Sequence, residues 1–465
     1  MNDLMFRDQT DSVARRASAN SEASTSTSIS TASGSRTRQP SPGREVAARD
    51  YFFQHFITPG HLAFLEGMTP DVLLLKTILA CGTAGLANRD NASKGNEVAR
   101  RYYVEAIAAT NTALRHPTQV KDDSTLISVH LLALYERLTW EAATSIESWK
   151  QHVQGSAQVL ELRGRHQIIT PVGAALFRNL RASIIVNCLW SETEAPQYLV
   201  QWTQALEYDP MHTPADRLAL IAVRVAALKY GFRTRDKRDN ELADMAASSE
   251  ADLISWSEET LAADSICSFH NVIDPESSHS WNGARHEYRM PHFFRYWNMW
   301  RCLRILVSRV HEAVWRRSWP TLPQTPPSPE HFRTTRERMA TDICVTAAYA
   351  LSSDNSADPP QGSVSSGYLL ITPLCLAALC LIEQLAEPTV SPGGSKIIHI
   401  NEPLHLDPFN SNSTQLAWII ERVDYIADKI GIKWATAVSK FLKGESKVHY
   451  DLGRSRVIME TEVLA

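Results

Sequence analysis

Apolar positions recur at helical spacing along most of the chain, most clearly over Ser124–Trp190. The first segment of this stretch, DSTLISVHLLALYERLTW, is apolar on nearly every side, which is typical of a helix in the middle of a core. The second, SWKQHVQGSAQVLELRG, has apolar residues at steps of three and four, after a capping-box pattern that starts at Ser148. Gly164 then predicts a left-handed helix end, and Thr170-Pro171 predicts the cap and first turn of a third helix.

The same periodicity predicts further helices outside this stretch. They span residues 71–86, 97–114, 214–230, 293–319, 338–351, 367–385 and the segment from Ser413 to the end of WATAVSKFL. Residues 268–283 combine Pro, Ser, Asn and Gly and are interpreted as an irregular loop, while KIIHINEPLHL at 396–406 is interpreted as extended or inserted. Because no strand-rich run with hairpin turns is visible, the fold is predicted to be all-α, with one large multi-helix domain over residues 50–465.

Two polar segments suggest how this domain is bounded. Residues 1–49 are rich in Ser and Thr and have too little apolar surface to offset the entropy of folding, so they are predicted to form a disordered tail. Arg36, Arg38 and Arg44 in the tail are compatible with a weak nuclear-import signal, although a solubilising role explains them better. The Pro-rich segment TLPQTPPSPEHF is interpreted as a surface linker, and it suggests a subdomain break near residues 320–332.

Composition excludes several classes of protein. The net charge of −4 argues against a polycation built for nucleic acid, and a hydrophobic content of 44% is too low for a protein with many membrane spans. The longest apolar run, from Tyr368 to Ile382, is interrupted by Pro373 and is expected to stop short of a bilayer crossing. No apolar segment of signal-peptide type is present at the N-terminus, so neither membrane insertion nor secretion is expected.

The seven cysteines are scattered, and no CxxC pair occurs anywhere in the sequence. Most of them lie inside apolar helical patterns, which predicts buried, reduced thiols and an intracellular protein. A zinc site of the usual close spacing is therefore not expected. His130, His152 and His166 have no HxxxH partner and are interpreted as core or surface histidines. No metal and no cofactor is predicted.

The segment FFRYWNMWRCLRILVSRVHEAVWRRSW offers the best local case for a nucleic-acid interface, because arginines alternate with tryptophans along it. The arginines are Arg295, Arg301, Arg304, Arg309, Arg316 and Arg317. Its apolar residues, however, form a single seam at steps of three and four, running from Trp300 to Val314. The pattern therefore favours a core helix whose arginines occupy a solvated face, and no DNA-binding residue is assigned.

The motifs that would indicate catalysis are missing from the sequence. It contains no Gly-rich phosphate loop, no GxSxG elbow and no HExxH helix. The single Asp-Asp pair, Asp122-Asp123, is followed by no further carboxylate and is better explained as the N-terminal end of a helix than as a magnesium site. No catalytic residue is assigned and no enzyme is expected. The competing hypothesis is an all-α enzyme or small-molecule-binding protein with no recognised catalytic motif.

Three segments, in this order, carry a family resemblance: LLALYERLT, SWKQHVQGSAQVLELRG and TPVGAALFRNLRASIIVNCL. Together they resemble the regulatory domain of fungal-specific transcription factors, and the resemblance is expected to cover nearly everything after residue 50. In that family the helical domain lies C-terminal to a DNA-binding cluster of six cysteines and two zinc ions. A linker similar to residues 1–49 normally joins the two parts.

The resemblance implies a nuclear transcriptional regulator that forms homo- or heterodimers and works with the transcription machinery. It also implies control of a metabolic or secondary-metabolite gene set, and it leaves open a small-molecule effector. Because this sequence lacks the six-cysteine cluster, DNA binding is expected only indirectly or through a zinc cluster outside it. Three alternatives follow: a truncated start, a regulator that depends on a DNA-binding partner, or an inhibitor that forms unproductive dimers.

Overall fold

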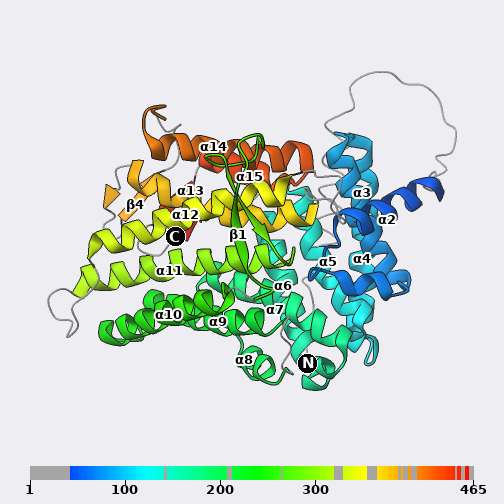
Figure 1. Cartoon of the computed structure of the whole chain (residues 1–465). Coiled ribbons are helices and arrows are strands. Elements are labelled where there is room, and N and C mark those ends of the chain that lie inside the picture. The colour runs from blue at the N-terminus through cyan, green and yellow to red at the C-terminus, as the bar shows by residue number, and fades with distance from the viewer. Residues whose placement is uncertain are drawn as a thin grey trace. The chain divides into compact units, whose positions relative to one another are not determined.

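The computed structural model describes residues 42–140, 144–206, 212–262, 265–318, 328–352, 364–385, 389–390, 396–399, 406–445, 448–451 and 456–459. Helices make up most of this part of the chain (Figure 1), which confirms the predicted all-α class. The chain divides into two compact units. Unit 1 contains the described residues up to Phe56 together with Phe64–Gln167, and unit 2 contains Ile57–Ala63 and the described residues from Ile168 onward.

Unit 1 is built around α3 and α5. Its elements are α2 (Pro42–His55), η1 (Ala63–Gly67, which begins one residue before the unit), α3 (Val72–Arg89), α4 (Ser93–Arg115), η2 (Gln119–Lys121), α5 (Asp123–Thr139), α6 (Thr144–Arg163) and η3 (Arg165–Ile169, which ends beyond it). Helix α3 packs against α2, α4 and α5, and α5 packs against α6 as well. As predicted, α5 is buried on nearly every side, from Leu126 to Leu138. It is therefore the centre of this unit.

The N-terminal boundary of order differs from the prediction. Residues 42–49, which were expected to belong to a disordered tail, form the first half of α2, and residues 1–41 lie outside the described residues. Ala48 and Phe52, one turn apart on α2, are buried, and the Tyr102 hydroxyl of α4 donates a hydrogen bond to Glu45 at 2.6 Å. Composition averaged over the tail concealed this short apolar face, which packs against α3.

The predicted helix ends are mostly confirmed. The side chain of Asp71 accepts a hydrogen bond from the Leu74 amide at 2.8 Å at the start of α3, and Gly164 has the expected left-handed conformation, with φ +80°. The capping box at Ser148 is wrong, because α6 begins at Thr144 and Ser148 lies buried inside it. Tertiary packing of that face outweighs the local capping signal.

Removal of the cap of α7 (Pro171–Ser191) is expected to have a modest effect on stability. The Thr170 hydroxyl accepts a hydrogen bond from the Gly173 amide at 3.1 Å. Thr170→Ala should lower the free energy of unfolding by about 1 kcal/mol, measured by chemical denaturation. Thr170→Ser keeps the accepting oxygen and serves as the control, and an equal loss in this variant would show that the cap is not responsible.

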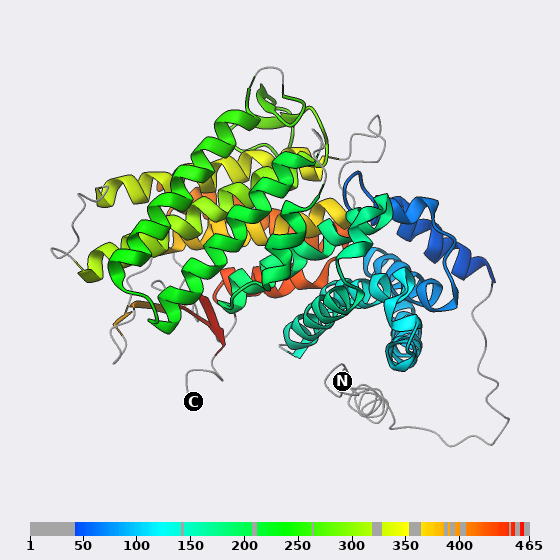
Figure 2. The same ribbon diagram turned by 90° about the horizontal axis from the view of Figure 1, so that it is seen from below.

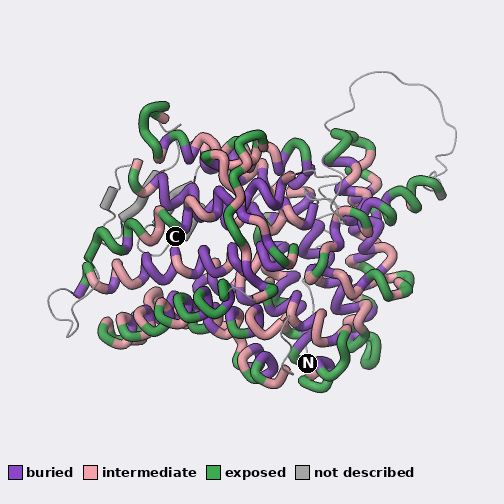
Figure 3. Tube along the Cα trace, in the orientation of Figure 1, coloured by how far each residue is buried: buried purple, intermediate pink, exposed green. Residues whose placement is uncertain are grey.

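Unit 2 is the larger of the two and is a stack of long helices (Figure 2). Its helices after α7 are α8 (Gln197–Gln204), α9 (Thr213–Thr234), α10 (Asp239–Thr260), α11 (Phe293–Ser318), α12 (Pro329–Leu351), α13 (Val364–Leu385), α14 (Ser411–Tyr425), the π-helical turn η4 (Ile426–Ile430) and α15 (Lys433–Leu442). Helix α11 packs against α9, α10, α12 and α13, and α13 also packs against α14 and α15. Most residues of α11 and α13 are accordingly buried (Figure 3).

The predicted break near 320–332 does not coincide with the division between the units. Helices α11 and α12, on either side of it, pack together within unit 2. Residues 319–327 lie outside the described part of the chain. The two units instead divide at Gln167 and Ile168.

Short strands occur where none was predicted. Strand β1 (Phe269–Ile273) lies inside the segment interpreted as an irregular loop, and β2 (Ala284–Tyr288) directly follows that segment. The two strands pair antiparallel, with Phe269 opposite Tyr288. Asn282 and Gly283 both have positive φ and form the turn of an isolated bridge between Trp281 and Ala284, directly before β2. The buried side chains of His286 and Tyr288 face α12, so packing fixes the hairpin.

A second sheet contains four antiparallel strands in the order β3 (Thr389–Val390), β4 (Lys396–His399), β5 (Val448–Asp451) and β6 (Arg456–Met459). Strand β4 confirms the extended interpretation for residues 396–399, while 400–405 lie outside the described residues. These strands are a small part of the described chain.

Pro373 lies inside one continuous helix, α13, which begins at Val364, before the predicted start at residue 367. By length and composition alone, α7 and α13 are candidate membrane spans among the described helices. Most of α13 is buried against neighbouring helices of unit 2, which accounts for its composition. A core helix meets the same criteria, so these two helices are weak evidence for a membrane.

Candidate functional site

Several buried arginine side chains of unit 2 lie on α11, and other helices cover α11 on several sides. Its arginines were predicted to occupy a solvated face, but Arg301 has no exposed surface and Arg309 is also buried. Arg316, in the last turn, remains exposed. The prediction is therefore wrong for the middle of α11. The physical reason is that α9, α10, α12 and α13 surround this helix, so it has no wide outer face there.

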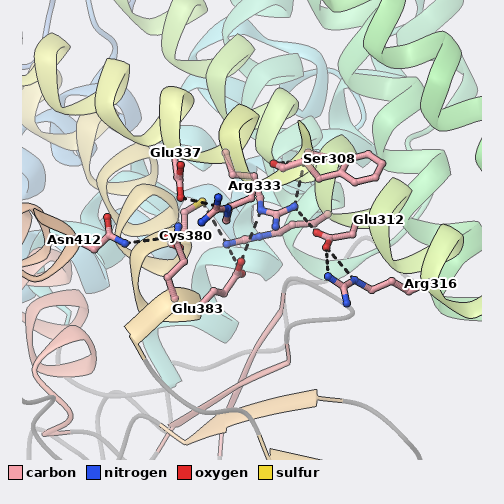
Figure 4. Close-up of polar contacts among 12 residues, drawn as sticks. Ser308, Glu312, Arg316, Arg333, Glu337, Cys380, Glu383 and Asn412 are labelled. Atoms are coloured by element: carbon pink, nitrogen blue, oxygen red, sulfur yellow. Dashed lines mark hydrogen bonds and ion pairs between the residues drawn. The ribbon is translucent and has the colours of Figure 1, made fainter. Parts of the chain in front are cut away.

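Buried ion pairs connect α11 with α12 and α13 (Figure 4). The Arg309 Nη2 atom lies 2.5 Å from Glu383 Oε1 of α13, with only 3% and 12% of the two side chains exposed. Arg336 of α12 lies 2.7 Å from Glu312 Oε2 of α11, and its Nε atom lies 3.9 Å from Glu383 Oε2. Arg336 also donates a hydrogen bond to the Ser308 hydroxyl at 3.2 Å. Two guanidinium groups and two carboxylates thus alternate across three helices.

The alternation of arginines and glutamates determines whether this network can serve a structural or a catalytic role. Each charge has an opposite charge beside it, which offsets part of the large cost of moving ions out of water. The carboxylate oxygens already contact guanidinium groups of neighbouring helices, so they are not placed to take a proton from a substrate. The network therefore fits a role in fixing the register of three helices better than a role in proton transfer.

A cysteine adjoins this network. The Arg309 Nη2 atom lies 3.5 Å from Cys380 Sγ. Burial raises the pKa of Cys380 to about 11, although the Arg309 charge acts in the opposite direction. The thiolate is the reactive form of cysteine, so this thiol is inert near neutral pH.

A second polar cluster surrounds Arg301. Its Nη1 atom donates to the Tyr288 hydroxyl at 3.2 Å, to Asn298 Oδ1 at 3.0 Å and to the Thr346 hydroxyl at 3.0 Å. Its Nη2 atom donates to His286 Nδ1 at 3.1 Å, so this nitrogen is the acceptor and the imidazole proton lies on Nε2. Burial and the Arg301 charge together lower the pKa of His286 to about 2. The histidine is therefore neutral at any physiological pH.

The Arg301 cluster attaches the β1–β2 hairpin to α11 and α12. Its acceptors come from β2, α11 and α12, and Phe269 of β1 lies with its ring centroid 5.3 Å from the guanidinium carbon. Because Arg301 is completely enclosed, a ligand from solvent cannot reach it in this conformation. We conclude that the cluster anchors the hairpin.

The cysteines and histidines singled out from the sequence are dispersed. All seven cysteines are buried and unbridged, which confirms their predicted burial. Burial lowers the pKa of His130 and His152 to about 4, and His166 is exposed. Within the described residues, no group of three or more His, Cys, Asp or Glu side chains is placed to hold a metal ion. The absence of a metal and of a cofactor remains a prediction.

The Asp122-Asp123 pair lies where the sequence placed it, at the start of α5. Asp122 occupies the N-cap position, and Asp123 forms an ion pair with Arg163 of α6. Both helices belong to unit 1, so this carboxylate contributes to their packing. No catalytic role is assigned to either residue.

Sequence reasoning missed the carboxylate partners of the buried arginines. Glu383 follows a run of apolar residues in α13, and Glu250 of α10 lies 2.6 Å from Arg304. An acidic residue inside a strongly apolar helix is a signal for a buried ion pair, because burial without a partner is too costly. Such a sequence pattern indicates that the acidic residue has a basic partner. Which basic residue this is depends on how the helices pack.

A protein-family model described as "Fungal specific transcription factor domain" matches residues 32–277, more than half of the chain. The match covers all described residues of unit 1, together with α7–α10 and β1 of unit 2. It ends before α11, whereas the resemblance was expected to continue through nearly all of the chain after residue 50. Searches of curated proteins and of solved structures found no match.

Proposed function

The chain belongs to the family of fungal-specific transcription factor domains and is a fungal transcriptional regulator, and we propose that it acts in the nucleus as the helical regulatory and dimerisation part of a zinc-cluster-type factor. The family match over residues 32–277 is the observation that carries this proposal. Its all-α architecture agrees with the fold expected of such a regulatory domain.

The chain is proposed to act as a regulator and not as a catalyst. Among the described residues, the buried charges of α11–α13 are arranged as ion pairs, and Cys380 is held as a protonated thiol. Neither arrangement supplies an activated nucleophile or a base poised near neutral pH. Ion-pair networks between rigid helices are one means by which a scaffold carries coupling between distant sites.

DNA recognition is proposed to be indirect, or to depend on a zinc cluster outside this sequence. The chain has a net charge of −4, and the arginines in the middle of α11 are buried and hydrogen-bonded to other side chains, so they do not offer a phosphate-binding surface. Homo- or heterodimers and the transcription machinery are the proposed partners. The proposed targets are a metabolic or secondary-metabolite gene set.

A tethering experiment tests the regulatory role. Fused to a heterologous DNA-binding domain, the full chain is expected to change transcription of a reporter in a fungal host several-fold, while the unfused chain leaves that reporter unchanged. Analytical ultracentrifugation of the purified chain should show a dimer in equilibrium with monomer. A folded, nuclear fusion without any effect on transcription would overturn the proposal. A strictly monomeric chain would overturn the dimerisation part alone.

A further inference from the structure

The β1–β2 hairpin has one edge that faces solvent. Its sheet contains only these two strands, and Figure 1 shows them in front of α11 and α12. Strand β2 packs against α12, and its residues His286 and Tyr288 are buried. Strand β1 has no buried residue and exposes three of its five residues. The solvent-facing edge of this sheet is therefore the outer edge of β1.

The register of the hairpin determines which backbone groups face outward from β1. The Asp274 amide donates to the Gly283 carbonyl at 2.7 Å, and the Arg289 amide donates to the Ser268 carbonyl at 3.2 Å. The five residue pairs between these two bonds are consecutive and contain no bulge. Hydrogen-bonded and non-hydrogen-bonded pairs alternate along an antiparallel ladder. Every second residue of β1, beginning with Phe269, therefore directs its amide and carbonyl groups away from β2.

Three residues carry these outward groups: Phe269, Asn271 and Ile273. Within the described chain, none of their amide and carbonyl groups hydrogen-bonds to another backbone group. Asn271 is exposed, and the Ile273 residue is 87% exposed. A row of unpaired backbone donors and acceptors along a strand is a template for a further strand.

Strand β1 also lacks several features that often protect a sheet edge, and it is held firmly in place. Its sequence, FHNVI, contains no Lys, no Pro and no acidic residue. The Phe269 ring lies 4.8 Å from the Trp297 ring of α11, and Arg301 binds His286 of β2. Because the hairpin is anchored in this way, a partner strand would not have to order the edge before it binds.

The outward groups are arranged symmetrically about Asn271. When Asn271 lies opposite the same residue of a second, antiparallel copy, Phe269 lies opposite the second copy's Ile273. All three outward residues then form hydrogen-bonded pairs with the other strand. The exposed Ile273 side chain gains the Phe269 side chain as a neighbour on the same face of the sheet. Because β1 contains no Asp, Glu, Lys or Arg, this pairing brings no like charges together.

We propose that the outer edge of β1 is a dimer interface, at which β1 pairs antiparallel with β1 of a second copy of this chain, centred on Asn271. The two hairpins then form one continuous sheet in the strand order β2–β1–β1–β2. Two five-residue strands bury less than the roughly 1,200 Å² of a stable interface, so the dimer is expected to be weak and reversible. This inference rests on the dimerisation part of the proposed function and names the surface that carries it.

Sedimentation equilibrium of the full chain tests this pairing through the charge at position 271. Asn271→Lys and Asn271→Asp each place two like charges opposite each other, and each should weaken self-association at least tenfold. An equimolar mixture of the two variants places opposite charges together and should regain association. Ser248→Lys adds the same charge at an exposed position of α10 and should associate like the wild type. A mixture that associates no better than either variant alone would refute the Asn271 register.

Cross-linking provides a second test of the register. The Cα atoms of a hydrogen-bonded pair lie about 5.5 Å apart, so Asn271→Cys should give a disulfide-linked dimer under mild oxidation. Ile273→Cys is the matched control, because its two introduced thiols would lie more than about 10 Å apart along the paired strands. The seven natural cysteines are buried and should contribute little background. Melting curves establish that each variant is folded, and equal cross-linking of both variants would contradict the pairing.

The outcomes distinguish this interface from the proposed function. Dimers that persist unchanged in both Asn271→Lys and Asn271→Asp would overturn the β1 interface and leave dimerisation to another surface. A strictly monomeric wild-type chain would overturn both the interface and dimerisation, and it would leave the β1 edge to an extended segment of a different protein. The tethered reporter tests the regulatory role independently of either result.

Discussion

Arg309→Met is expected to lower the free energy of unfolding by about 3–5 kcal/mol, because the substitution leaves the Glu383 carboxylate buried with much less compensation. Glu383 is 12% exposed, and the nearest remaining cation described in the network, Arg336, has its Nε atom 3.9 Å from Glu383 Oε2. The loss should appear in urea denaturation of the full chain as a lower midpoint with an unchanged slope.

A double-mutant cycle separates loss of the pair from loss of packing. Arg309→Met combined with Glu383→Gln removes both charges, so the double variant should recover much of the stability lost by Arg309→Met alone. Arg316→Met breaks an ion pair with Glu312 in which the arginine is 55% exposed, and it should cost no more than about 1 kcal/mol. If Arg309→Met proved as mild as Arg316→Met, the buried network would not be a source of stability.

Gly82→Ala should disrupt the packing of α2 on α3 and lower the free energy of unfolding by about 3 kcal/mol or more. A Cβ atom at this position would lie 2.0 Å from the carbonyl oxygen of Ala48 and 2.8 Å from its carbonyl carbon. Both contacts are with backbone, which cannot rotate away as a side chain can, so α2 must move. Chemical denaturation measures the loss, and faster proteolysis within residues 42–55 should accompany it.

The matched control for this substitution is in the partner helix. Gly43, near the start of α2, has nothing within 4 Å of an added Cβ atom. Gly43→Ala should be neutral or stabilise the chain by up to about 1 kcal/mol, since Ala is the better helix former. A destabilising effect of Gly43→Ala as large as that of Gly82→Ala would show that the helix approach is not the cause.

Helices and several of their ends could be predicted because they depend on residues close together in the chain. Asp71, Gly164 and Thr170 act within three or four residues, so their roles are visible in the sequence. The failure at Ser148 has the same origin, since a capping pattern is a local preference and the packing of α6 overrides it. The β1–β2 hairpin was missed because its strands are short and packing against α12 holds them.

The candidate site could not be predicted from the sequence, and α11 shows why. Its apolar seam indicated a core helix, and the burial of Trp300 and Val314 confirms this. The same periodicity led to the prediction that the arginines occupy a solvated face. Periodicity shows which face of a helix is apolar, but it does not show how many other helices will pack around it. Once α12 and α13 also cover α11, Arg309 becomes buried and Glu383 becomes its partner.

The sequence by itself determined the helical class, the family and the burial of the cysteines, because periodicity and segment order are properties of neighbouring residues. Only the tertiary structure decided which charges meet. Arg178 and Asp216, on α7 and α9, come together because these two helices pack against each other. Charge pairing between distant segments depends on the fold, since burial sets both the cost of each charge and the partners within its reach.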